Sequence, residues 1–90
     1  MKKITLSEFW NQTKKQAIHC KTEYEANKLL FAFNKLGKKW YSGYDYLTVN
    51  CWKSYKENTC YDNFNLFCSI DWYKSIGCKV YEFDEVDLDN

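Results

Sequence analysis

The stretch from Ile18 to Gly43 constrains the fold of this chain more than any other. It contains an amphipathic helix, predicted over about residues 22–36. Thr22 and Glu25 have the spacing of a capping box, in which each side chain can bind a free amide hydrogen at the helix start. Gly37 then supplies a left-handed stop. Apolar residues at helical spacing form the predicted buried face: Ala26, Leu29, Leu30, Phe33 and Leu36.

The segments around this helix have the alternation and turn residues of short strands. Strands are predicted at residues 16–20, 39–41, 44–51, 59–61, 65–70 and 78–83, with 39–41 and 44–51 forming a hairpin. Ser7 is expected to cap a short helical turn, unless the first residues form an arm that docks on the sheet. One helical turn is also expected at residues 52–57, and a short helical turn or a wide loop at 71–77. The fold class is therefore α+β, with one main helix packed on a mostly antiparallel sheet of four to five short strands.

The chain is short enough to form one domain. Its 90 residues include 20% aromatic side chains, whose large buried area compensates for a small core. We expect residues 1–83 to form the compact domain and residues 84–90 to form an acidic C-terminal tail that frays. The aromatic content exceeds what one small core can hold, so some rings should lie at the surface.

Charge and cysteine usage exclude several classes of function. The net charge of +1 gives little drive for general nucleic-acid binding, and no apolar run approaches the roughly 18 residues of a membrane span. Five cysteines without a CxxC pair, and a single histidine, argue against a metal site. An odd cysteine count without a signal peptide indicates reduced thiols and a cytoplasmic location. No cofactor is expected.

No catalytic motif is present in the sequence. His19 and Cys20 are neighbours in a predicted strand, so their side chains point to opposite faces and cannot form a nucleophile–base pair. Cys60 or Cys68 could approach His19 through the fold, although nothing in the sequence requires it. The three glycines are isolated and form no phosphate-binding loop. We therefore expect a protein that is not an enzyme.

Aromatic and basic residues cluster after the main helix and recur further along the chain. Rings can stack on nucleotide bases, worth about 1–3 kcal/mol each, while lysines and backbone amides neutralise phosphates. In the alternative interpretation, the tryptophans are core anchors and the lysines are solvated. The predicted base-stacking residues are Trp40, Tyr41, Tyr44, Trp52 and Tyr61, and the predicted phosphate-binding residues are Lys38, Lys39, Ser42, Gly43 and Thr59.

Several short motifs span nearly the whole chain: FW near the start, AIHC before the helix, LGKKWYSG after it, then TCY, SIDWY and KVYEF. Together they resemble a widespread group of small phage and prophage proteins of Gram-positive bacteria. The resemblance implies an anti-defence role in the host cytoplasm. One such role is to sequester a cyclic nucleotide immune signal without cleaving it, in pockets between the subunits of a homo-oligomer.

The alternative role is that of a protein-binding inhibitor of a host defence complex, of the anti-CRISPR type. It would use the exposed aromatic residues and the acidic C-terminal segment, which could mimic a nucleic-acid backbone. Such a segment can equally be a solubilising end. Its acidic residues are Glu82, Asp84, Glu85, Asp87 and Asp89.

Overall fold

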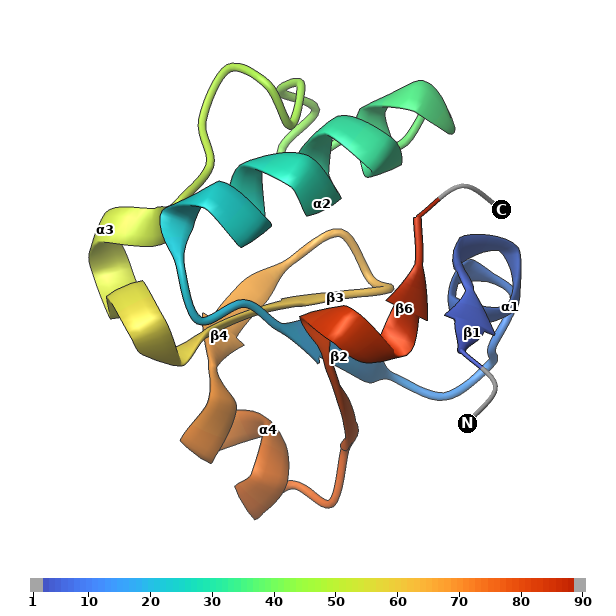
Figure 1. Ribbon diagram of the computed structural model, residues 1–90, viewed down its shortest axis with the longest axis vertical. Helices are drawn as coiled ribbons and strands as arrows, with labels where there is room; N and C mark the ends of the chain where they lie inside the picture. The colour runs from blue at the N-terminus through green and yellow to red at the C-terminus, as the bar shows by residue number, and fades with distance from the viewer. Residues whose placement is uncertain (1–2, 89–90) are drawn as a thin grey trace.

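A four-stranded β-sheet lies between the longest helix, α2, and a shorter helix, α4 (Figure 1). The computed structural model describes residues 3–88. The sheet has the order β4–β3–β2–β5, in which only the β2–β5 pair is parallel. Its strands are β2 (Gln16–His19), β3 (Thr59–Asp62), β4 (Phe67–Ser69) and β5 (Lys79–Glu82). The predicted α+β class and mostly antiparallel sheet are confirmed.

Helix α2 (Glu23–Lys35) is capped much as its sequence predicts. The Thr22 hydroxyl accepts a hydrogen bond from the amide of Glu25 at 3.1 Å. The Glu25 carboxylate binds the amide of Lys21 at 2.9 Å, one residue before the position expected for a capping box. Leu36 was wrongly placed on the buried face: it follows the last helical turn and is 47% exposed. The other four predicted residues of that face, Ala26, Leu29, Leu30 and Phe33, are buried.

Aromatic rings fill the space between α2 and the N-terminal helix α1 (Leu6–Trp10). The ring centroid of Phe33 lies 6.0 Å from that of Phe9 and 4.9 Å from that of Trp10. Helix α1 is capped by Thr5 and not by Ser7. The Thr5 hydroxyl accepts a hydrogen bond from the amide of Glu8, and the Glu8 carboxylate accepts one from the amide of Thr5. The predicted helical turn is confirmed and the predicted cap is wrong.

Helix α4 (Ile70–Ser75) covers the opposite face of the sheet. Its buried residue Tyr73 donates a hydrogen bond from its hydroxyl to the Asp62 carboxylate at 2.7 Å. The other carboxylate oxygen of Asp62 accepts hydrogen bonds from the amides of Phe64 and Leu66, at 2.8 and 3.0 Å. Asp62 therefore fixes both the β3–β4 turn and the position of α4.

The predicted hairpin at residues 39–51 is wrong, since only one isolated bridge forms, between Lys39 and Asp45. Side chains satisfy the backbone of this segment instead: the Trp40 indole nitrogen donates to the carbonyl oxygen of Val49 at 2.8 Å. The Tyr61 hydroxyl donates to the carbonyl oxygen of Asn50 at 2.6 Å. The chain then forms helix α3 (Trp52–Tyr55) and the 3-10 helix η1 (Lys56–Asn58).

The segment predicted to be a frayed tail is folded through residue 88, so the prediction of fraying is wrong there. It forms the 3-10 helix η2 (Phe83–Glu85) and strand β6 (Val86–Asp87), which pairs in parallel with β1 (Ile4–Thr5). Val86 is only 3% exposed, and this burial holds the segment in place. The rest of the predicted tail, residues 89 and 90, lies outside the described residues, as do residues 1 and 2. No helix within residues 3–88 has the length and apolar character needed to cross a membrane.

Candidate functional site

The turn formed by residues 40–44 is held by backbone hydrogen bonds. The Trp40 amide donates to the carbonyl oxygen of Tyr44 at 2.9 Å, and the Gly43 amide donates to that of Trp40 at 2.8 Å. Gly43 has a φ of 95°, a left-handed conformation that glycine adopts without a steric penalty. Asn65 ties the turn to the β3–β4 loop, because its carbonyl oxygen accepts the Tyr41 amide at 2.8 Å. The two tyrosines of the turn are thus carried on a fixed backbone.

A pocket of about 260 Å³ lies beside this turn, and we call it the tyrosine pocket. Tyr41 and Tyr44 form part of its rim and are 80% and 64% exposed. Trp40 is buried, and its ring lies 5.6 Å from that of Phe67, a further lining residue. The pocket brings together four predicted site residues, and its full lining is Trp40, Tyr41, Ser42, Tyr44, Val49, Cys51, Asn65, Leu66 and Phe67.

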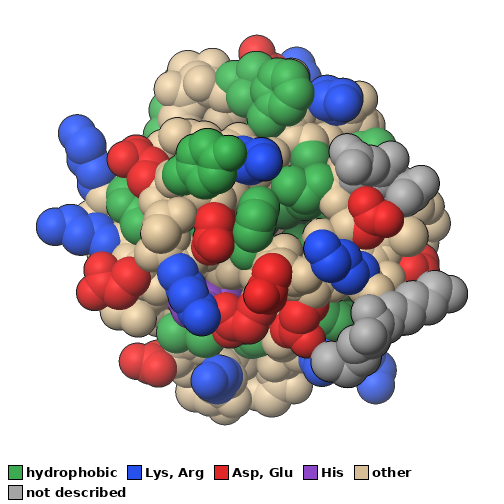
Figure 2. Space-filling view, in the orientation of Figure 1, with side chains coloured by type: hydrophobic (Ala, Val, Ile, Leu, Met, Phe, Trp, Pro, Cys, Tyr) green, Lys and Arg blue, Asp and Glu red, His purple; other side chains and the backbone are tan. Residues whose placement is uncertain are grey.

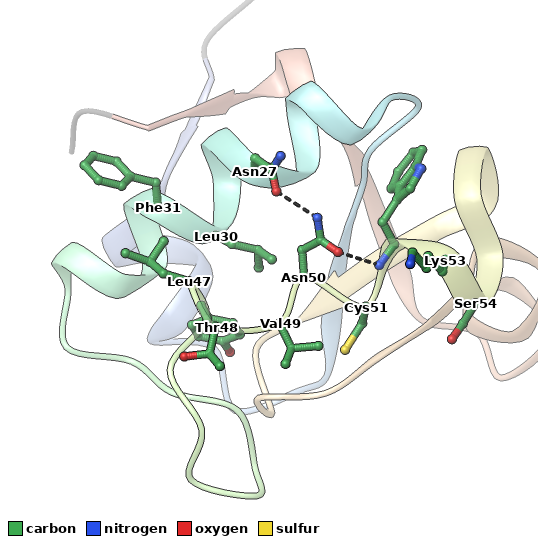
Figure 3. Close-up of a pocket in the computed structure, with 12 residues that line it drawn as sticks. Asn27, Leu30, Phe31, Leu47, Thr48, Val49, Asn50, Cys51, Lys53 and Ser54 are labelled. Atoms are coloured by element: carbon green, nitrogen blue, oxygen red, sulfur yellow. Dashed lines mark hydrogen bonds between the residues drawn. The ribbon is translucent and has the colours of Figure 1, made fainter.

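A larger groove of about 780 Å³ lies between α2, the loop at residues 46–51 and α3 (Figure 3). Its lining includes Trp52, another predicted site residue, and Lys53. Asn50 bridges the groove, since its side-chain amide nitrogen donates to Asn27 and to Glu23, each at 2.9 Å. The side-chain oxygen of Asn50 accepts a hydrogen bond from the backbone amide of Trp52 at 3.1 Å. Sequence reasoning missed Asn50, because its partners on α2 are distant along the chain.

The remaining predicted site residues lie elsewhere. Thr59 and Tyr61 are fully buried in β3, and burial raises the pKa of the Tyr61 hydroxyl well above its usual range. The Lys38 ammonium lies 4.9 Å from the ring centroid of Trp10, on the α1 side of the core. The Lys39 ammonium lies 3.6 Å from the Asp45 carboxylate. The residues predicted to hold phosphates therefore do not converge on the tyrosine pocket.

The fold brings His19 and Cys60 together, since they are register partners in β2 and β3. The His19 Nδ1 atom lies 2.8 and 3.1 Å from the carboxylate oxygens of Glu82, and Nε2 lies 2.7 Å from the carbonyl oxygen of Glu57. Both ring nitrogens are thus occupied. Burial, reinforced by the negative charge of Glu82, raises the pKa of Cys60 to about 12. At neutral pH Cys60 is a protonated, buried thiol, so this cluster stabilises the fold and offers no activated nucleophile.

These burial differences predict a pattern of thiol labelling. With Ellman's reagent at pH 8 in native conditions, Cys20 and Cys60 should remain unmodified, because both are inaccessible and burial raises the pKa of each thiol. The partly exposed Cys51, Cys68 and Cys78 should be modified first. Peptide mass spectrometry assigns the sites, and the denatured chain, in which all five should react, is the control. Equal labelling of Cys60 in the native and denatured chains would contradict this prediction.

Metal-ligating residues do not gather in the described chain: residues 3–88 contain no group of three or more His, Cys, Asp or Glu side chains placed to hold a metal ion. Comparison of the chain with protein-family models, with curated proteins and with solved structures finds no match.

Proposed function

We propose that this chain is a phage-encoded anti-defence protein that binds a cyclic nucleotide immune signal in the host cytoplasm without cleaving it. The observation that carries the proposal is the pair Tyr41 and Tyr44, two largely exposed rings on a hydrogen-bonded turn beside a concave, mainly apolar surface. The backbone of this turn is already ordered by hydrogen bonds, so it loses little conformational entropy when a ligand stacks on the rings. The tyrosine pocket would hold one base of the ligand.

The chemistry of the tyrosine pocket favours binding over reaction. None of its nine lining residues is Asp, Glu, His or Lys, and burial raises the pKa of its one thiol, Cys51. The pocket therefore offers a bound phosphodiester neither a strong general base nor an activated nucleophile. Ser42 supplies a hydroxyl for the edge of a base. Lys39 would contact a phosphate only after releasing Asp45, and such an exposed ion pair opens at little cost.

Calorimetry with cyclic dinucleotides, cyclic trinucleotides and cyclic ADP-ribose isomers tests the proposal. We expect Tyr41→Ala and Tyr44→Ala each to weaken binding by about fivefold or more, because each removes a stacking ring. Tyr24→Ala is the matched control, since Tyr24 is 69% exposed but lies on α2, outside the tyrosine pocket. The ligand recovered afterwards should be chemically unchanged. Absence of binding at micromolar concentrations, or recovery of a cleaved ligand, would contradict the proposal.

The oligomeric state separates this proposal from its alternative. A sponge that places its ligand between subunits should be a stable homo-oligomer, whereas an inhibitor that occupies a single site on a host protein can act as a monomer. Light scattering of the purified chain measures this directly. A stable dimer or tetramer would support the sponge, and a monomer at all concentrations would favour the inhibitor.

The alternative, a protein-binding inhibitor of a host defence complex, is favoured by one feature of the surface. Figure 2 shows Asp and Glu side chains gathered at the centre of one face, around the single histidine. Deleting residues 84–90 would be a poor test, because it removes the buried Val86 and opens the β1–β6 pair. Asp84→Lys, at an exposed position, reverses charge with the fold kept. If inhibition of the defence complex survives this change, nucleic-acid mimicry that depends on Asp84 is excluded.

A further inference from the structure

The side of α2 that faces away from the core carries alternating aromatic rings and lysines. These residues are exposed, and we call them the α2 stripe: Tyr24, Lys28, Phe31 and Lys35. At about 100° per residue along a helix they fall within a sector of roughly 60°, opposite the buried Phe33. Figure 3 shows the Phe31 ring projecting away from the buried side chain of its neighbour Leu30.

A groove of about 360 Å³ extends along this stripe. It is lined by all four stripe residues and by Asn27, Ala32 and Leu88. Phe31 also lines the larger groove between α2 and the loop at residues 46–51, where Leu47 and Val49 are exposed as well. The exposed apolar surface therefore continues across α2. A contiguous surface of this kind is typical of an interface, whereas isolated exposed apolar residues are ordinary.

The spacing of the stripe is that of a coiled-coil seam. Its positions follow one another at steps of four, three and four residues, which matches the order d, a, d, a of a heptad repeat. The two rings then occupy d positions and the two lysines occupy a positions. In a parallel pair of such helices, equal positions face each other and each lysine would meet a lysine, which is repulsive.

An antiparallel pair of stripes is self-complementary instead. The steps of four, three and four residues are the same when they are read backwards, so a second copy related by a two-fold axis places every lysine opposite a ring. Tyr24 then faces Lys35 of the second copy, and Phe31 faces its Lys28. The acidic Glu23, next to Tyr24, also lies at the end of the helix that Lys35 of the second copy approaches.

The lysines of the stripe already lie close to rings within one chain. The Lys28 ammonium is 5.2 Å from the ring centroid of Tyr24, and the Lys35 ammonium is 5.8 Å from that of Phe31. In the antiparallel pair each ammonium would lie between two rings, one from each chain. A second ring adds a second cation–π contact, and burial between the helices strengthens both contacts.

We propose that the α2 stripe binds a second copy of this chain, with the two α2 helices packed antiparallel about a two-fold axis. Four facing positions make a small interface, so we expect a weak dimer with a dissociation constant of roughly tens of micromolar. Solutions at low micromolar concentration, as used for unfolding, then contain mainly monomer. The inference does not rest on the nucleotide proposal, because no stripe residue lines the tyrosine pocket.

Sedimentation equilibrium from micromolar to millimolar concentration tests the proposal. We expect the unsubstituted chain to pass from monomer to dimer. Lys28→Glu places a carboxylate against the Phe31 ring, and Phe31→Lys places a lysine against Lys28, so each should weaken the dimer by about tenfold or more. The double variant with both changes should recover the dimer, because its two new charges attract each other across the two-fold axis. In a parallel pair the same double variant would bring like charges together and would stay monomeric.

Lys79→Glu is the matched control for Lys28→Glu. Lys79 is exposed, and its ammonium lies 5.1 Å from the ring centroid of Tyr81, a similar cation–π setting on β5 and away from α2. Tyr24→Ala should weaken the dimer and leave nucleotide binding at the tyrosine pocket unchanged, whereas Tyr41→Ala should have the reverse effects.

Three results would overturn the proposal: a chain that stays monomeric at millimolar concentration, a double variant that does not recover the dimer, or equal weakening by Lys79→Glu and Lys28→Glu. A dimer that survives both Lys28→Glu and Phe31→Lys would use another surface. That result also overturns the proposal, but it leaves the nucleotide proposal standing.

Discussion

Phe33→Ala should lower the free energy of unfolding by about 3–5 kcal/mol. Phe33 is fully buried, and its ring contacts those of Phe9, Trp10 and Tyr46 at centroid distances of 4.9–6.0 Å. The substitution therefore leaves a cavity between α1, α2 and the loop that no neighbouring ring can fill without losing its own contacts. In a domain of this size the loss is a large part of the total stability. Urea unfolding followed by tryptophan fluorescence measures it.

Phe31→Ala is the matched control for Phe33→Ala. It removes the same ring from the same helix, but Phe31 is 53% exposed. We expect a change within about 0.5 kcal/mol, as is usual for surface positions. In thermal unfolding, the buried variant should lose at least about 12 °C in Tm and the control only a few degrees. Equal losses in the two variants would contradict the packing of α2 described above.

Asp62→Ala should destabilise the fold by a similar amount, about 3–5 kcal/mol. Asp62 is 1% exposed and its carboxylate accepts three hydrogen bonds. Alanine leaves the buried hydroxyl of Tyr73 and the partly buried amides of Phe64 and Leu66 without their acceptor, and donors that lose their partner away from water are costly. Urea unfolding of the variant gives the free energy of unfolding, and amide hydrogen exchange at Phe64 and Leu66 should accelerate.

Tyr73→Phe tests the hydrogen bond between Tyr73 and Asp62 separately from the two amide hydrogen bonds of the turn. It deletes one donor and leaves the two amide bonds of the turn, so we expect a loss of about 1–2 kcal/mol with hydrogen exchange at Phe64 and Leu66 little changed. Asp71→Ala, at an exposed position on the same helix as Tyr73, should have a small effect. If Asp62→Ala proves no worse than Asp71→Ala, the carboxylate does not hold the turn.

Local signals made α2 predictable from the sequence. The cap at Thr22, the helical spacing of apolar residues and the stop at Gly37 all act within a few positions of one another. The strands β2 and β5 were found from their alternation, which is also a local signal. The parallel pairing of β2 with β5 was not found, because it joins segments that are far apart in the sequence and no local pattern specifies a partner.

The candidate site was less accessible to sequence reasoning. Aromatic and β-branched residues over 44–51 predicted a strand, but the side chains of Trp40 and Tyr61 form hydrogen bonds with the backbone of this segment. Whether a ring lies in the core or at the surface depends on such distant contacts: Trp40 and Tyr61 are buried, while Tyr41 and Tyr44 are exposed. The aromatic composition was clear from the sequence, and its division between core and surface was not.

The parallel pairing of β1 with β6 and of β2 with β5 gives this fold a mechanical property. When a chain is stretched from its two ends, the earlier strand of a parallel pair is drawn one way and the later strand the other, so the strands slide along each other. All hydrogen bonds of the pair then carry the load together, whereas a hairpin can open one bond at a time. Tension applied through residues 3 and 88 would load first the outer pair and then the central one in shear. The domain should therefore resist stretching better than its resistance to heat or urea alone suggests.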